Sequence, residues 1–205
     1  TYLVMNCRPG SVFYHRLISL QLRGLEASAS MNDDLVSRIL RAVDVENLKR
    51  TTCDFVSYPS FTFEEGPLAE YLAQRMRRLG MQVETQSVSG SKQVVGTLKG
   101  SGGGESLMLC GHLDIDYWTG EDWRTPPFEC IIEGDRAYGA GVCNMKAGDA
   151  SMLMAIDTIA KAGVDLKGDL LYAGVMGEMN GGVGAQHLAE KGVRADHCII
   201  GEPTG

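Results

Sequence analysis

Polar side chains that could bind a metal follow three apolar runs of this sequence. His112 and Asp114 come just after Leu-Met-Leu-Cys-Gly. Glu178 follows a longer run that ends in Val-Met-Gly, and Glu202 follows Cys-Ile-Ile-Gly. In open α/β sheets, ligands bind beyond the carboxyl ends of the strands, so residues in these places are expected to meet. Imidazole nitrogen and carboxylate oxygen are common ligands of zinc and related ions, and the pattern therefore predicts a metal site.

The spacing of His112 and Asp114 has a physical reason of its own. A metal-binding imidazole usually has its second ring nitrogen held by a carboxylate or a carbonyl. Residues two apart in an extended segment point to the same side, so Asp114 can hold the ring of His112. The pair alone is a weak signal, because a hydrogen-bonded surface pair has the same pattern. Its meaning depends on the strands around it.

The elements that must position these residues alternate between helix and strand. Apolar residues at helical spacing predict helices over about 33–49, 65–80, 148–162 and 184–191. Short apolar or alternating runs predict strands at 82–88, 93–98, 107–110, 170–176 and 198–201. This order favours an α/β domain with layers around a largely parallel sheet. The irregular stretch from Asp114 to Ala147 is long for a compact domain, and such loops are usually functional.

The composition is that of a globular protein. Of the 205 residues, 44% are hydrophobic and 22% are charged, and the formal net charge is −7. This acidic balance disfavours a nucleic-acid or anionic-membrane partner. No apolar run approaches the roughly 18 residues needed to span a bilayer, so no membrane contact is expected. We therefore expect a cytoplasmic protein.

The cysteines are scattered, and none forms a C-x-x-C pair. They stand at Cys7, Cys53, Cys110, Cys130, Cys143 and Cys198. A zinc-thiolate clip is therefore not expected. Cys110 and Cys198 lie in apolar runs, which suits reduced, buried thiols in a reducing compartment. Cys143 is likewise expected to be a buried structural thiol rather than a metal ligand.

The first 30 residues differ in charge from the rest. Arg8, Arg16 and Arg23 stand there against a single acid, Glu26, a balance of +2. Such an Arg-containing, acid-poor segment is typical of a transit-type leader. An extension ahead of the true start is favoured over a leader, because Met31 opens a clear helical pattern. The predicted domain therefore covers residues 31–205, with residues 1–30 as an extension or leader.

Taken in order, the motifs of this chain resemble those of a known enzyme family. The motifs are Gly111-His112-Leu113-Asp114, Trp123 with Pro127-Phe128, Tyr138-Gly139-Ala140-Gly141 running into Asn144-Met145-Lys146-Ala147-Gly148, Gly177-Glu178-Met179-Asn180-Gly181-Gly182-Val183-Gly184, and Ile200-Gly201-Glu202-Pro203-Thr204. They resemble the zinc-dependent amidohydrolase and exopeptidase family of acetylornithine deacetylase, succinyl-diaminopimelate desuccinylase, aminoacylase and glutamate carboxypeptidase. The resemblance covers about residues 31–205, and order, spacing and strand context all agree.

The resemblance implies a three-layer α/β/α catalytic domain that hydrolyses the amide bond of a small N-acyl amino acid or a short peptide. In the family, two zinc ions (or cobalt or manganese) share a bridging aspartate and activate a water molecule. A glutamate then passes the proton of this water to the leaving nitrogen. Glu178 matches that general base. His112 and Glu202 match ligands of one metal, and Asp114 matches the residue that orients the histidine.

The sequence departs from the family at the metal ligands. The bridging aspartate falls at Asn144, whose neutral side chain offers one carbonyl oxygen and an NH₂ group that repels a cation. The family's second glutamate falls at Met179, and a thioether is a poor ligand for zinc. The family's last ligand is a histidine far downstream of the position of Gly205. We therefore expect at most one weak metal site, held by His112 and Glu202 with the carbonyl of Asn144.

The family also inserts a smaller α+β lid or dimerisation domain just after the Glu-Pro-Thr segment, and later strands then close the sheet. This chain is expected to be truncated before both, which predicts an exposed sheet edge or apolar face. Activity is therefore expected to be impaired. The alternative is a pseudoenzyme or a small-molecule binding module that keeps the cleft without turnover. Asn144 and Met179 are the residues that discriminate between the two, because an active two-metal enzyme needs carboxylates there.

Overall fold

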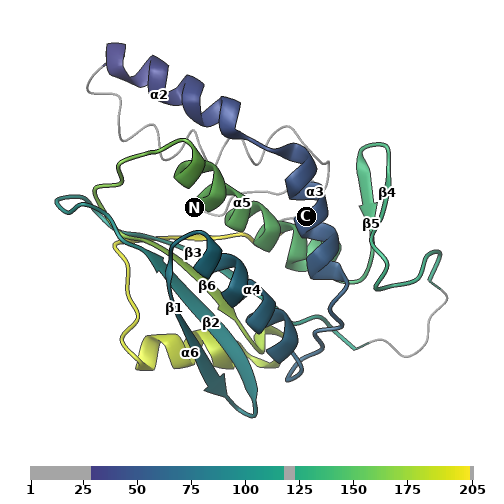
Figure 1. The fold of residues 1–205 in the computed structure, drawn as a ribbon. Coiled ribbons are helices and arrows are strands. Elements are labelled where there is room, and N and C mark those ends of the chain that lie inside the picture. The colour runs from purple at the N-terminus through teal and green to yellow at the C-terminus, as the bar shows by residue number, and fades with distance from the viewer. Residues whose placement is uncertain (1–28, 118–122, 204–205) are drawn as a thin grey trace.

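The computed structural model describes residues 29–117 and 123–203. A five-stranded sheet lies at its centre, with helices on both faces (Figure 1). The α/β class and the layered architecture predicted from the sequence are therefore confirmed. The predicted leader lies outside the described residues except at its end, because the first described helix begins at Ala29. No helix in the described part of the chain is long and apolar enough to cross a membrane.

Five helices are described, and each overlaps one of the four predicted ranges. They are α2 (Ala29–Ala42), α3 (Val45–Val56), α4 (Gly66–Arg78), α5 (Ala147–Lys161) and α6 (Val183–Glu190). The single helix predicted over 33–49 is wrong, because the chain breaks between α2 and α3. Asp44 has extended backbone angles, and its side chain accepts the N–H of Asn47 at 2.9 Å. Such a bond satisfies one of the free donors at a helix start, so it stabilises a new helix here.

The strands follow the predicted ranges closely, but they do not form the largely parallel sheet that was predicted. They are β1 (Gln82–Val88), β2 (Ser91–Leu98), β3 (Leu107–His112), β6 (Leu170–Val175) and β7 (His197–Ile200). Their order in the sheet is β1-β2-β6-β3-β7. β3 runs parallel to β6 and β7, whereas β2 is antiparallel to both β1 and β6. The sheet is therefore mixed rather than largely parallel, and its three parallel strands end at one shared edge.

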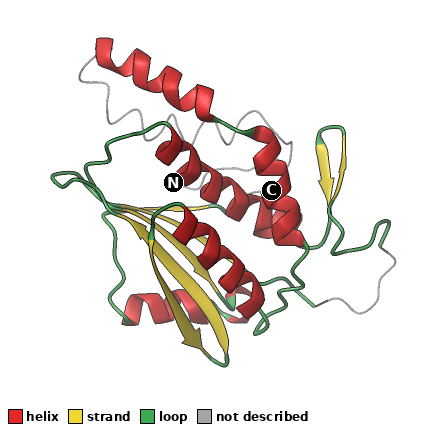
Figure 2. Cartoon of the chain, in the orientation of Figure 1, coloured by secondary structure: helices red, strands yellow, loops and turns green. Residues whose placement is uncertain are grey.

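The helices bury one face of the sheet more heavily than the other (Figure 2). On one face, α4 and α5 pack with the sheet around Leu72, Leu153 and Tyr172, all fully buried. α4 presents its apolar residues at helical spacing, with Leu68, Ala69, Leu72, Ala73 and Met76 buried. On the other face, Leu188 of α6 packs in a smaller apolar cluster. These layers fix the parallel strands whose ends carry the candidate site.

β7 is an edge of the sheet within the described residues. Ile200 on this strand is 56% exposed, and Cys198 is exposed as well. The expectation of an exposed sheet edge with apolar side chains is therefore confirmed. The expectation that Cys198 is buried is wrong, although it is a free cysteine, as is the half-buried Cys110. Cys143 is exposed, so the expectation of a buried thiol is wrong there too.

The long irregular stretch after β3 contains one small element of its own. The strands β4 (Ile131–Glu133) and β5 (Arg136–Tyr138) form a hairpin that projects from the body of the molecule (Figure 1). A disulfide between Cys53 of α3 and Cys130 ties the base of this hairpin to the core. The expectation of reduced cysteines therefore does not hold for this pair. Near the other end of the hairpin, the N–H of Ala140 donates to the carbonyl of Pro127 at 2.6 Å.

Candidate metal centre and active site

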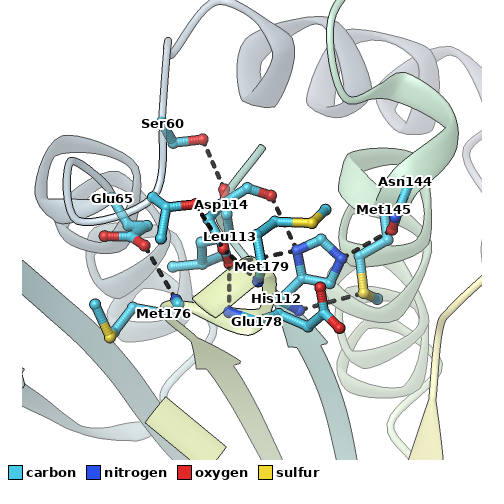
Figure 3. A network of polar contacts seen from close by, with 12 residues as sticks. Ser60, Glu65, His112, Leu113, Asp114, Asn144, Met145, Met176, Glu178 and Met179 are labelled. Atoms are coloured by element: carbon cyan, nitrogen blue, oxygen red, sulfur yellow. Dashed lines mark hydrogen bonds and ion pairs between the residues drawn. The ribbon is translucent and has the colours of Figure 1, made fainter. Parts of the chain in front are cut away.

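His112 is the last residue of β3, and its ring is held on both nitrogens (Figure 3). The residue is only 2% exposed. Nδ1 lies 2.9 Å from the backbone carbonyl oxygen of Asp114 and 3.5 Å from its side-chain Oδ1. The predicted orienting role of Asp114 therefore has a structural basis, but the nearer contact is with the main-chain carbonyl. Such a contact fixes which way the imidazole faces and leaves Nε2 for another partner.

Two oxygens from other elements face Nε2 of His112. Oδ1 of Asn144 lies 2.8 Å away, and Oε1 of Glu202 lies 3.2 Å away. Asn144 belongs to an irregular turn, Val142–Lys146, that leads into α5, and Glu202 follows β7. Both side chains retain solvent exposure while His112 has almost none. The structure thus brings together the three residues for which the sequence predicted a metal site.

The turn that carries Asn144 is anchored in the core by the next residue, Met145. Met145 is fully buried in the main core, and its sulfur receives the backbone N–H of His112 at 3.2 Å. The N–H of Lys146 bonds the carbonyl of Gly141, which has a left-handed φ of 73°. Because Met145 packs against β3, the side chain of Asn144 is directed to the end of that strand. This is how the turn delivers an oxygen to His112.

The electrostatics around His112 favour its charged form. Burial lowers the pKa of His112, but the bonds to Asp114 and Asn144 and the nearby charge of Asp149 outweigh burial and raise the pKa to about 9. Burial raises the pKa of Glu202, and the positive charge of His112 opposes that rise. An imidazole that binds a cation must be neutral, so binding at Nε2 would release a proton. The surroundings of the ring are therefore already arranged for a positive charge.

The donor set fits one cation and does not fit two. An imidazole nitrogen and a carboxylate oxygen are ligands that zinc accepts, and Asn144 adds one neutral oxygen. In the described part of the chain, no group of three or more His, Cys, Asp or Glu side chains has the geometry of a metal site. At the place of the family's second glutamate stands Met179, whose thioether is a weak ligand. His112, Glu202 and Asn144 are therefore the residues that could hold a cation beside Nε2.

Glu178 lies at the same edge of the sheet, three residues beyond the buried end of β6. It begins a short 3₁₀ turn, Glu178–Asn180, and its side chain is exposed beside the ring of His112 (Figure 3). The backbone N–H groups of Glu178 and Met179 donate to the two carboxylate oxygens of Asp114, each at 3.0 Å. Thr62 donates to the same carboxylate at 3.2 Å. Asp114 therefore ties His112 and Glu178 into one structure.

The pKa of Asp114 records these bonds. Burial raises it, but the contacts with His112 and the two backbone N–H groups outweigh burial and hold the pKa below its ordinary value. The Asp114 side chain is fully buried. A buried carboxylate that accepts several hydrogen bonds stays ionised, and it keeps its partners in place. Asp114 thus holds both the imidazole of His112 and the turn that follows β6.

Three buried polar residues of this region were not predicted from the sequence. Glu65 and Gln93 contact the backbone of the turn that carries Glu178. Asp149 of α5 is fully buried, accepts the hydroxyl of Tyr172 at 2.8 Å, and leaves Oδ2 without a partner among the described residues. Burial raises the pKa of Asp149 to about 7 and lowers that of Lys146 to about 7. Polar residues in apolar stretches are the signal that could have marked them.

Comparison with known proteins defines the class to which this fold and site belong. Residues 108–205 match the profile of the family described as peptidase family M20/M25/M40. The matched segment includes every residue for which a metal or catalytic role was predicted, from His112 to Glu202. This match places residues 108–205 within the peptidase family. The predicted family resemblance is therefore confirmed.

Two curated relatives show the extent of the similarity in sequence. The chain is 35% identical over 139 residues to N-formyl-4-amino-5-aminomethyl-2-methylpyrimidine deformylase of Halalkalibacterium halodurans, covering 66% of this chain and 33% of that protein. It is 33% identical over 161 residues to succinyl-diaminopimelate desuccinylase of an Azoarcus species, covering 74% of this chain and 41% of that protein. The chain thus spans well under half the length of these relatives.

Solved structures support the fold. Human carnosine dipeptidase 1 superposes with a TM-score of 0.71 at 19% identity, over 81% of this chain and 41% of that one. Aminopeptidase PepT from Bacillus cereus superposes with a TM-score of 0.68 at 21% identity, over 80% of this chain and 45% of that one. At such low identity these likenesses speak for the fold alone.

Proposed function

We propose that this protein hydrolyses amide bonds in small N-acyl amino acids or short peptides, with at most one divalent cation held by His112, Glu202 and the side-chain oxygen of Asn144. The observation that carries the proposal is the meeting of two oxygens with Nε2 of His112, at 2.8 and 3.2 Å, beside Glu178. When bound, zinc or a similar ion would polarise the scissile carbonyl and make water more acidic.

In this proposal the side chains of the protein carry out proton transfer and positioning. Glu178 is exposed at the strand edge, so its carboxylate can take a proton from the attacking water and give it to the leaving nitrogen. Asp114 holds the ring of His112 on one side and the turn of Glu178 on the other. The substrate class follows the names of the relatives, a deformylase and a desuccinylase, and those of the peptidases that share the fold.

A non-catalytic binding module is the second candidate, and the same site supplies its support. Asn144 and Met179 stand where the family carries carboxylates, so the anionic ligands of a second cation are lost. A site that keeps one cation, or none, could still bind an acyl amino acid without turning it over. The two candidates differ in turnover, and they share the fold and the binding edge.

Metal analysis with a hydrolysis assay tests the proposal. The purified protein is dialysed against Zn²⁺, its metal content is measured by mass spectrometry, and N-formyl, N-acetyl and N-succinyl amino acids and dipeptides are supplied as substrates. One bound ion with turnover that disappears in Glu178→Gln supports hydrolysis. Binding of acyl amino acids without turnover, unrescued by combining Asn144→Asp with Met179→Glu, would favour the binding module instead.

A further inference from the structure

Four consecutive backbone N–H groups lead into the turn that carries Glu178, and a buried side chain receives each of them. The pairs are Met176 with Gln93 at 3.4 Å, Gly177 with Glu65 at 3.0 Å, and Glu178 and Met179 with Asp114 at 3.0 Å each. In ordinary structure such groups bond to other backbone groups. Here the chain leaves the sheet at β6, and side chains from three other segments take over its hydrogen bonding.

Within this set, Glu65 is the residue whose buried position is not explained by its own helix. It stands directly before α4 and is fully buried, 112 residues away in sequence from Gly177. A residue in this place usually caps its own helix, but the side chain of Glu65 makes no such bond to α4. Its carboxylate instead receives the N–H groups of Phe63 and Gly177, both at 3.0 Å, and the hydroxyl of Ser91.

The turn that donates these bonds also has internal backbone hydrogen bonds, such as that from the N–H of Gly182 to the carbonyl of Gly177 at 3.0 Å, but it is rich in glycine. Gly177, Gly181 and Gly182 all have left-handed φ, between 66° and 81°. Glycine adopts this conformation freely, and for the same reason it loses the most entropy when it is fixed. A Cβ on Gly177 would also lie 2.6 Å from Cγ2 of Val183, so no larger residue can stiffen the turn there. The buried side chains that receive its N–H groups therefore add restraint that the glycines do not provide.

We propose that Glu65 is a positioning residue for Glu178: by holding the N–H of Gly177 it fixes the peptide plane between Met176 and Gly177, where the chain enters the turn, and so helps to aim the side chain of Glu178 at the ring of His112 (Figure 3). Asp114 fixes the next two N–H groups, so the two carboxylates together define the turn. The inference rests on the proposed function only for the use that Glu178 makes of its position.

Amide hydrogen exchange tests the positioning without relying on turnover. In Glu65→Asp the carboxylate is one methylene shorter and loses Gly177, so exchange at Gly177 and Glu178 should rise about tenfold or more. In Glu65→Gln the side-chain oxygen can keep Gly177 while the NH₂ group donates to Ser91, so the rise should be a few-fold. Ser91→Ala is the matched control, because it removes another bond of Glu65 and leaves that to Gly177.

The order expected is wild type and Ser91→Ala lowest, Glu65→Gln intermediate and Glu65→Asp highest, with global stability monitored by urea unfolding. Equal exchange in Glu65→Asp and wild type would overturn the proposal. So would an equal rise in Ser91→Ala, which would mean general loosening. If Glu65→Asp does not fold, the comparison of Glu65→Gln with Ser91→Ala decides by the same criterion.

Kinetic measurements then test whether the position of Glu178 matters for catalysis. In an active protein, Glu65→Asp should lower kcat about 10- to 100-fold with little change in KM, because substrate still binds while the base is misaimed. A loss confined to KM would overturn the aiming of Glu178. Absence of turnover in every variant, wild type included, would refute the proposed hydrolysis and leave the exchange result to judge the positioning by itself.

Discussion

The side-chain oxygen of Asn144 lies 2.8 Å from Nε2 of His112, at the position where the family resemblance places a bridging carboxylate. An amide brings a dipole to this point, whereas a carboxylate would bring a full negative charge with two acceptor oxygens. The turn that carries Asn144 is anchored by the buried Met145, so a substitution at Asn144 changes the charge without needing a new backbone path.

Asn144→Asp should therefore strengthen zinc binding. We expect the affinity to rise roughly 10- to 100-fold, the size of effect that changes around a metal ligand commonly have. Isothermal titration of the metal-free protein with Zn²⁺ measures it. His112→Ala is the control in both backgrounds and should remove binding in each. Equal affinities of wild type and Asn144→Asp would show that Asn144 does not contact the ion.

Glu178→Gln should separate catalysis from binding. The substitution keeps the size of the side chain and the backbone bonds to Asp114, but it removes the group that accepts a proton. We expect kcat to fall about 10²- to 10⁴-fold, while zinc affinity and the urea midpoint stay close to those of wild type. Glu190→Gln, at the exposed end of α6, removes the same charge far from the strand edge and should leave kcat unchanged. A similar fall in both variants would contradict the role of Glu178 as base.

The site was predictable to the extent that its residues follow apolar strands. His112, Asp114 and Glu178 each come just after a buried run, and in a sheet with parallel strands such places share an edge. Which strands pair with one another could not be predicted in the same way. β2 is antiparallel to β6, and nothing local in either strand records which neighbour it takes or in which direction. That choice is made by packing of the whole sheet, which is why the sheet proved mixed.

Residues that act across long sequence distances were also beyond local reasoning. Glu65 reads as part of a helix start, and its bond to Gly177 exists only because α4 packs beside β6. The Cys53–Cys130 bond joins residues 77 apart, and sequence alone does not reveal how cysteines pair. The break between α2 and α3 is different, because Asp44 three residues before Asn47 is a capping signal that could have been recognised.

The disulfide between Cys53 and Cys130 should contribute measurably to stability. Joining residues 77 apart removes entropy from the unfolded chain, and bonds of this kind typically contribute about 2–4 kcal/mol. Urea unfolding with and without dithiothreitol should therefore differ by that order, and Cys53→Ser with Cys130→Ser should unfold like the reduced wild type under both conditions. Cys198→Ser, at an exposed cysteine outside this bond, is the control and should keep the response to reductant. A stability independent of reductant in this control would contradict the prediction.

Asp149 should make the stability of the protein fall as the pH rises. Burial raises the pKa of Asp149 from 3.8 to about 7, so the folded state holds its proton more tightly than the unfolded state does. The stability linked to this proton is fully present below about pH 4 and is lost as the pH rises toward 7. In Asp149→Asn nothing titrates at this position. Between pH 4.5 and 6.5, the free energy of unfolding of wild type should therefore change by about 2–3 kcal/mol relative to that of the variant, in the direction of lower stability for wild type.

Urea unfolding of both proteins across this interval measures the change, and the interval lies below the range in which Lys146 and His112 act. The pKa of Glu202 is also raised, but Glu202 is present in both proteins, so its contribution largely cancels in the difference. The lowered pKa of Lys146 acts above pH 7, and the raised pKa of His112 acts above about 6.5. Tyr172→Phe is the matched control. The hydroxyl of Tyr172 donates to Asp149 and lowers its pKa, so without it the loss of stability should extend to higher pH. Parallel pH profiles for wild type and Asp149→Asn would show that Asp149 is ionised in the folded protein at pH 4.5, against the effect of its burial.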